Sequence, residues 1–213
     1  MPFSFPKIYP ILDASIIPVA NRTEYLRGLG NSLADAGVTL LEYRNKTGAD
    51  AELLADAAVL RAAMPVQNVK LILDDRVDLV EQAAFDGVHV DAGNFAPAAA
   101  RKLIGQHRIV GTFGGSEELL PGILNEPADY FSVGPAYPTT TKQTTKPPIG
   151  PEGVRRLRQQ AGPKPVLVAA GGITLETAPS ILAAGANTVA VSAAIFRTPD
   201  PAVEFRRWMA ALG

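Results

Sequence analysis

The sequence contains no cysteine, so the protein has no disulfide, no thiolate metal site and no cysteine nucleophile. Its formal net charge is −1 and it has no basic block, which argues against a grip on the phosphate backbone of a nucleic acid. The apolar runs are too short to span a bilayer, and residues 1–6 lack the charged and apolar regions of a signal peptide. These absences predict a soluble cytoplasmic protein without a nucleic-acid or membrane partner.

Hydrophobic residues are abundant, at 47% of the 213 residues, so the chain can build a sizeable core. Short apolar runs alternate along it with amphipathic segments. The runs predict eight strands, at residues 8–12, 39–44, 69–73, 87–90, 108–111, 130–133, 166–170 and 188–191. Apolar residues at helical spacing predict helical segments over residues 26–36, 53–60, 77–84 and 181–184. A last helix is predicted over residues 201–212, where proline opens the first turn.

Strands that alternate with helices at intervals of about twenty to thirty residues are typical of a (β/α)8 barrel. The predicted fold class is therefore α/β, a TIM barrel formed as a single domain by residues 1–213. An open doubly wound sheet is the alternative, but such a sheet normally has a glycine-rich first turn, and residues 13–18 contain no glycine.

A polar loop follows the sixth predicted strand. Its threonines include Thr139, Thr140, Thr141 and Thr144, and its lysines are Lys142 and Lys146. Hydroxyl and ammonium groups solvate phosphate oxygens, and ligands of α/β proteins bind beyond the carboxyl ends of strands. The loop therefore indicates a phosphate site, with an ordinary solvated surface loop as the alternative.

The second strand ends with charged residues at every other position. Glu42, Arg44 and Lys46 alternate with Tyr43 and Asn45. The period of two places the three charged groups on one side of the strand, and facing the helices would be costly for them. We expect them to line the mouth of the barrel; the alternative is a strand end that splays outwards, with Lys46 in solvent.

Carboxylates follow the third and fourth strands. Asp74 and Asp75 beside a phosphate site suit Mg2+, which prefers oxygen ligands and bridges to phosphates. Alternatively, Asp75 and Asp78 cap the next helix. His89 and Asp91 close the fourth strand, and the pattern assigns no role to His89.

The last two strands indicate a second phosphate site. Gly171 and Gly172 follow the seventh strand, and Val191 and Ser192 end the eighth. Glycines let backbone N–H groups approach an anion, and a short helix that starts near Ser192 would direct its positive end to the same point. A tight turn that needs glycine is the alternative interpretation; it explains one glycine but not the pairing with Val191 and Ser192.

These residues make the chain resemble the thiamine phosphate synthase family from Tyr9 to Phe196. The resemblance rests on Arg44 with Lys46, Asp75-Arg-Val-Asp78, Asp86-Gly-Val-His89, Gly134 to Lys142, Pro147-Pro-Ile-Gly150 and Ala170-Gly-Gly-Ile173. It implies a (β/α)8 fold and the Mg2+-dependent joining of hydroxymethylpyrimidine diphosphate to thiazole phosphate. The products would be thiamine phosphate and pyrophosphate.

The resemblance also implies roles for residues. Arg44, Lys46 and Lys142 would be the catalytic groups that hold the diphosphate. The expected substrate-binding residues are Glu42, Arg44, Lys46, Asp74, Thr112, Thr139, Thr141, Lys142, Gly171, Gly172, Val191 and Ser192, and the expected metal ligands are Asp75, Asp91 and Asn94.

The chain departs from the family pattern at four positions. It has Glu42 for the usual glutamine, Asp74 for asparagine, Asn94 for a metal-binding aspartate and Phe113 for a serine. The first two changes add negative charge near a diphosphate, which Mg2+ or a proton must compensate. A thiazole tautomerase of the same fold and a non-catalytic protein that binds thiazole or thiamine phosphate are therefore the alternative functions. Barrels of this size often pair through helical faces, so a homodimer is one expectation.

Overall fold

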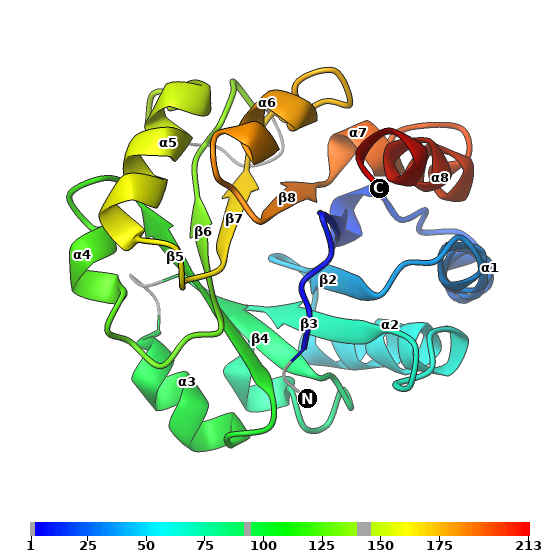
Figure 1. The fold of residues 1–213 in the computed structure, drawn as a ribbon. Helices are drawn as coiled ribbons and strands as arrows, with labels where there is room; N and C mark the ends of the chain where they lie inside the picture. Colours follow the sequence, from blue (N-terminus) through cyan, green and yellow to red (C-terminus); the bar gives the residue numbers. More distant parts are fainter. Residues whose placement is uncertain (1–2, 92–94, 140–145) are drawn as a thin grey trace.

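The computed structural model describes residues 3–91, 95–139 and 146–213. Its strands form a closed parallel barrel in which β8 pairs with β1, and the helices surround it (Figure 1). The strands are β1 (Ile8–Asp13), β2 (Leu40–Arg44), β3 (Lys70–Asp74), β4 (Gly87–Val90), β5 (Ile109–Gly115), β6 (Tyr130–Val133), β7 (Leu167–Ala170) and β8 (Thr188–Val191). The barrel prediction is confirmed, and the open sheet is excluded.

The helices cover the outside of the barrel (Figure 1). They are α1 (Arg22–Asp35), α2 (Asp50–Ala63), α3 (Pro97–Ile104), α4 (Leu120–Ile123), α5 (Gly150–Ala161), α6 (Ala178–Ala183), α7 (Ala193–Phe196) and α8 (Pro201–Leu212), with short 3-10 helices η1 (Ala14–Ile16) and η2 (Val77–Leu79). Within the residues that the structure describes, no helix is both long and apolar enough to cross a membrane.

The predicted helix over residues 77–84 is wrong. Only η2 forms there, followed by turns. Asp75 and Ala84 adopt left-handed backbone angles, with φ of 60° and 53°, so the chain bends sharply on both sides of the segment. Val77, Val80 and Ala83 are nevertheless buried, which explains their helix-like spacing in the sequence.

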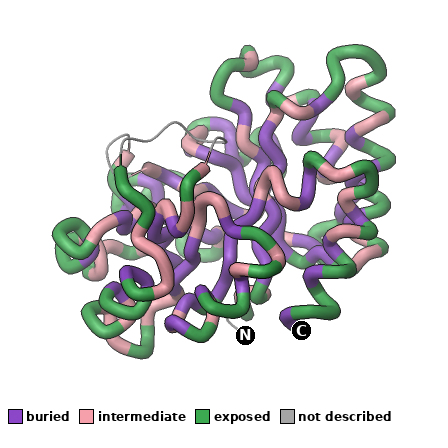
Figure 2. Tube along the Cα trace, turned by 90° about the horizontal axis from the view of Figure 1, so that it is seen from above, coloured by how far each residue is buried: buried purple, intermediate pink, exposed green. Residues whose placement is uncertain are grey.

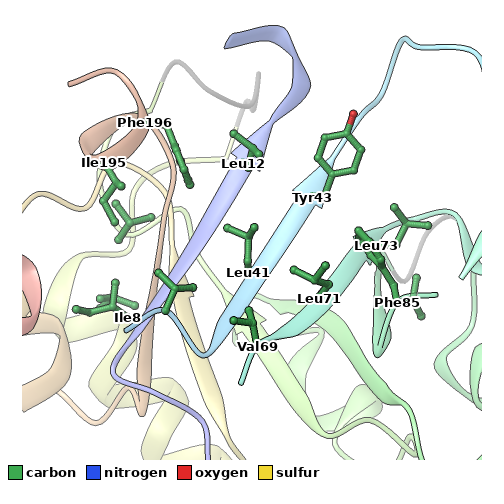
Figure 3. Close-up of a cluster of buried hydrophobic side chains, with 14 of the residues drawn as sticks. Ile8, Leu12, Leu41, Tyr43, Val69, Leu71, Leu73, Phe85, Ile195 and Phe196 are labelled. Carbon is green, nitrogen blue, oxygen red and sulfur yellow. The ribbon is translucent and has the colours of Figure 1, made fainter. Parts of the chain in front are cut away.

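The core has two layers. Inside the barrel lie Tyr9, Leu40, Ile72, Ile109, Tyr130, Val168 and Ala190. A larger layer between barrel and helices includes Leu41, Tyr43, Leu71 and Leu73 (Figure 3). Buried stretches follow the central strands, whereas the surrounding helices and loops carry the exposed ones (Figure 2).

The alternation along β2 sets the direction of its charged side chains. Leu41 and Tyr43 belong to the outer layer, and Leu40 belongs to the interior. Because successive side chains point to opposite faces of a strand, Glu42 and Arg44 face inwards with Leu40. The strand therefore delivers charge to the barrel interior, as its period of two predicts.

Candidate active site

A cavity of about 870 Å³ opens at the carboxyl ends of the strands. Ten of the expected substrate and metal residues line it: Glu42, Arg44, Lys46, Asp74, Asp91, Thr139, Gly171, Gly172, Val191 and Ser192. These residues come from both halves of the sequence, so the fold gathers them into one space. Thr141, Lys142 and Asn94 lie outside the described residues.

Thr112 and Asp75 are not among the described residues that line the cavity. Thr112 is fully buried and pairs in register with Phe131 of the outer core layer, so it sits on the opposite face of β5 from Phe113, which does line the cavity. Asp75 lies just beyond β3 and forms an ion pair with Lys46, which lines the cavity.

Two cations and three carboxylates meet at the cavity wall. Lys46 Nζ lies 2.6 Å from Asp74 Oδ2 and also pairs with Asp75. Arg44 pairs with Asp13, and its Nε lies 3.7 Å from Asp74 Oδ2. The Lys46 side chain is 33% exposed and lines the cavity, as the position at the barrel mouth predicts. The carboxylates hold the cations where an incoming anion would meet them.

The charge of Lys46 is secured by these partners. Burial by itself lowers the pKa of Lys46, but Asp74 and Asp75 outweigh it and raise the pKa above its usual value. Lys46 therefore carries its positive charge throughout the physiological range.

A chain of hydrogen bonds crosses the cavity floor. The Tyr9 hydroxyl donates to Glu42 Oε2 at 3.0 Å and lies 3.1 Å from the hydroxyl of Tyr130. His89 Nδ1 lies 3.1 Å from the same Tyr130 hydroxyl, and the two rings stack with centroids 5.5 Å apart. The chain links β1, β2, β4 and β6, so it fixes polar groups at the centre of the barrel.

Burial and a neighbouring carboxylate favour the protonated form of Glu42. Glu42 is 3% exposed, and burial, followed by the charge of Asp74, raises its pKa to about 8. A neutral carboxyl offers one donor and one acceptor, as an amide does. Burial raises the pKa of Asp74 as well, and Lys46 opposes that rise, so one proton held by the Glu42–Asp74 pair compensates one of the two extra negative charges.

The glycines after β7 form the second part of the site. Gly171 and Gly172 have φ of 93° and 64°, angles that side chains other than glycine rarely adopt. A Cβ at Gly172 would collide with the Pro138 carbonyl oxygen. Tyr137 N donates to the Gly171 oxygen at 2.9 Å, so the loop after β6 is tied to these glycines.

The eighth strand completes this part. Val191 and Ser192 line the cavity together with Ala193 and Ala194, the first residues of α7. The first N–H groups of a helix lack intrahelical partners. The backbone around Gly171, Gly172 and Ser192 therefore forms a concave wall suited to a phosphate.

The carboxylates beside β3 and β4 are the candidate metal ligands. Asp91 N donates to Asp75 Oδ1 at 3.1 Å, so these two residues are adjacent. The N-cap position of η2 is Arg76, which forms no side-chain cap, and Asp78 pairs with Arg76. The helix-cap interpretation of Asp75 and Asp78 is therefore wrong. In residues 3–91, 95–139 and 146–213, no group of three or more acidic or histidine side chains could hold a metal. One or two carboxylates are what Mg2+ needs when phosphates supply its other ligands, so Asp75 and Asp91 fit it.

Several of the residues that line the cavity were not identified from the sequence. Tyr9, Tyr130 and Ser132 line the cavity, as does an apolar wall of Phe113, Leu119 and Ile123. Lys146 Nζ lies 4.7 Å from the centroid of the Phe113 ring, within cation–π distance. The strand alternation could have identified Tyr9 and Tyr130, because inward positions near the carboxyl end of a barrel strand are site positions.

Comparison with known proteins agrees with this architecture. A family model described as thiamine monophosphate synthase matches residues 8–195. The thiamine-phosphate synthase of Koribacter versatilis is 38% identical over 91% of this chain and 90% of its own length. The thiamine-phosphate synthase of Agrobacterium fabrum is 33% identical over 91% of this chain and 88% of its own length. The solved structure of thiamine phosphate pyrophosphorylase from Pyrococcus furiosus matches with a TM-score of 0.80 and 26% identity, and covers 97% of both chains.

Proposed function

Because this chain belongs to the thiamine monophosphate synthase family, we propose that it joins hydroxymethylpyrimidine diphosphate to thiazole phosphate, a transferase reaction that gives thiamine phosphate and pyrophosphate. The observation that carries the proposal is the composition of one cavity. Two inward-facing cations, Arg44 and Lys46, share it with the glycine wall at Gly171 and Gly172. The cavity thus offers one place for a diphosphate and another for a monophosphate.

Arg44 and Lys46 bind the diphosphate in this proposal, and Lys142 from the loop after β6 joins them. Their positive charges stabilise the pyrophosphate as the bond between the pyrimidine methylene carbon and oxygen breaks. The thiazole nitrogen then attacks that methylene, and its lone pair forms the new carbon–nitrogen bond. The reaction needs no protein nucleophile, in keeping with a chain that has no cysteine.

Asp75 and Asp91 would hold Mg2+, with Asn94 as a neutral oxygen ligand. Bound there, Mg2+ supplies positive charge beside the diphosphate oxygens. Support comes from the adjacency of Asp75 and Asp91 and from the contact of Asp75 with Lys46. Asp75 also orients Lys46, together with Asp74, so the diphosphate meets a prearranged set of charges.

The thiazole phosphate binds at the other wall. Gly172, Val191 and Ser192 surround its phosphate. The hydroxyl groups of Thr139 and Thr141, in the loop after β6, donate hydrogen bonds to it. The pyrimidine lies on the floor, where Glu42 and Asp74 face the cavity. The neutral Glu42 carboxyl can both donate to and accept from a heteroaromatic ring.

The direct test is an assay of the purified protein with the pyrimidine diphosphate, the thiazole phosphate and Mg2+. Thiamine phosphate is detected after oxidation to its fluorescent derivative, with a chelator-treated sample as the control. We expect product that depends on the metal. A folded protein that binds thiazole phosphate but makes no product would instead indicate the tautomerase or the non-catalytic binding protein.

We also propose that the enzyme acts in the cytoplasm and pairs as a homodimer through its helical faces. A soluble biosynthetic barrel of this size supports both statements. Light scattering of the purified protein measures its mass in solution, and a monomer at all concentrations would contradict the dimer.

A further inference from the structure

The strand end that carries Arg44 and Lys46 has a second, outward-facing side. Tyr43 and Asn45 alternate with the two cations and are buried. Neither is among the described residues that line the cavity. Figure 3 shows Tyr43 on β2 above the apolar side chains of the outer layer. The outward side chains therefore contact the helices, while their neighbours in sequence, Arg44 and Lys46, face the cavity.

Asp56 of α2 lies at the centre of a polar cluster on this outer side. Its Oδ1 accepts from Arg22 Nε at 2.9 Å, and its Oδ2 accepts from Arg22 Nη2 at 2.6 Å and from the Tyr43 hydroxyl. Asp56 is 3% exposed. The cluster joins α1, α2 and β2, so it fixes the end of β2 against two helices.

Asn45 extends the cluster into the loop that follows β2. Its Nδ2 donates to the Tyr43 hydroxyl and to Glu52 Oε1, each at 3.2 Å. Its Oδ1 accepts from Gly48 N at 2.7 Å and from Thr47 N at 3.3 Å. These bonds to the backbone form a local turn immediately after Lys46. A Cβ at Gly48 would collide with the Asn45 side chain, so the two residues are matched.

A need for stability does not by itself account for this arrangement. Buried ionic clusters are often replaced by apolar side chains without loss of stability. A polar cluster with directional bonds does, however, set one orientation of the backbone that it holds. Here that backbone carries Arg44 and Lys46, two cations that lie beside Asp74 and line the cavity.

We propose that Asp56, Tyr43 and Asn45 are positioning residues for diphosphate binding, acting from behind β2 through the directions of Arg44 and Lys46. The inference rests on the proposed function for the identity of the substrate. It does not require that the second substrate bind or that product form. Pyrophosphate alone therefore serves as the probe.

Two mild variants test the cluster. Tyr43→Phe keeps the ring in the core and removes the hydroxyl that links Asp56 to Asn45, and Asn45→Ala removes the local turn. Asp129→Asn is the matched control, because Asp129 also pairs with a buried arginine, Arg101, at 2.6 Å, and accepts from Val110 N at 2.8 Å. Asp129 precedes β6 and so lies at the amino end of the barrel, away from the cavity.

Pyrophosphate binding is measured by calorimetry, and the KM of each substrate by the product assay. For Asn45→Ala we expect a rise of about tenfold in the pyrophosphate Kd and in the KM of the pyrimidine diphosphate, equivalent to about 1.4 kcal/mol. Tyr43→Phe should shift both in the same direction. The KM of the thiazole phosphate should stay unchanged in both variants, and Asp129→Asn should lower only the melting temperature.

The inference is overturned if both variants, folded by circular dichroism, bind pyrophosphate as the wild type does. It is also overturned if the KM values of the two substrates rise together, since that pattern indicates general loosening. A wild-type protein that binds pyrophosphate but makes no product would refute the proposed reaction and leave the binding comparison intact. Asp56→Asn serves as a third variant, because combined with Tyr43→Phe it should add little to either single effect.

Discussion

The Tyr9 hydroxyl donates to Glu42 Oε2 at 3.0 Å inside the barrel, and both side chains are almost completely buried. Tyr9 in turn contacts Tyr130, and Tyr130 contacts His89. This chain of bonds places the Glu42 carboxyl on the cavity floor, with neutral hydroxyl groups as its neighbours in the chain. Burial and the nearby Asp74 charge therefore dominate and raise the pKa of Glu42 to about 8.

Replacement of Glu42 by glutamine should flatten the alkaline limb of the pH–activity profile. Near neutral pH the carboxyl and the amide each offer a donor and an acceptor, so activity should be similar or slightly higher in the variant. As pH rises through about 8, the wild-type carboxyl ionises and repels the diphosphate, and kcat/KM should fall. Glu42→Gln should lack this fall. Profiles of kcat/KM for the pyrimidine diphosphate would show it, and a collapse of activity in the variant would mean that the ionised carboxylate is required.

The same substitution should alter the pH dependence of stability. The pKa of Glu42 in the folded protein is raised above its unfolded value, so its stabilising contribution is complete below the unfolded pKa and is lost as pH rises through about 8. The melting temperature of Glu42→Gln should therefore rise relative to that of the wild type as the pH increases from about 5 to about 9. A constant difference across that range would show that Glu42 does not change its protonation on folding.

Lys46→Met should weaken diphosphate binding more than it weakens the fold. The substitution keeps the aliphatic chain but leaves Asp74 and Asp75 without their shared ammonium partner. We expect the KM of the pyrimidine diphosphate to rise by about tenfold or more, since a charge-assisted contact is replaced by repulsion. Steady-state kinetics with each substrate in turn measure the effect. Lys102→Met at an exposed position of α3 is the control, and equal effects of the two variants would remove Lys46 from the site.

Gly172→Ala should damage the monophosphate wall. The backbone of Gly172 has φ of 64°, and a Cβ there would meet the Pro138 carbonyl, so the loops after β6 and β7 must separate. We expect the KM of the thiazole phosphate to rise by about tenfold, while pyrophosphate binding changes little. Gly28→Ala in α1 is the control, because a Cβ there meets nothing within 4 Å and should slightly stabilise the helix. Normal thiazole phosphate kinetics in Gly172→Ala would show that this wall does not hold the substrate.

Much of the barrel could be predicted from the sequence, because each strand is a short apolar run buried on both faces. The predicted strand over residues 130–133 matches β6, and that over residues 188–191 matches β8. The segment over residues 77–84 was wrongly predicted as a helix, because burial of Val77, Val80 and Ala83 gives the same spacing in η2 and its turns as in a helix.

The residues of the site could be predicted where a strand ends in charged residues. They were harder to predict where a contact joins residues that are far apart in the sequence. The alternation of Glu42, Arg44 and Lys46 predicted the cavity wall correctly. The bond between Tyr9 and Tyr130 joins residues 121 positions apart, and only the closed barrel brings them together. The raised pKa of Glu42 depends on that enclosure and on Asp74, so no local sequence pattern reveals it.

Lys142→Ala should lower turnover by orders of magnitude and leave the fold intact. Lys142 lies outside the described residues, in the threonine-rich loop that starts at Thr139, and Thr139 lines the cavity. Its charge would act on the departing pyrophosphate, and loss of one such group typically costs about a hundredfold or more in kcat. Single-turnover rates and melting temperatures of the variant and of Lys164→Ala, an exposed lysine before β7, measure the effect. Because the cavity already has Arg44 and Lys46, an unchanged rate in Lys142→Ala would mean that these two cations stabilise the leaving group alone and that the loop takes no part in the chemistry.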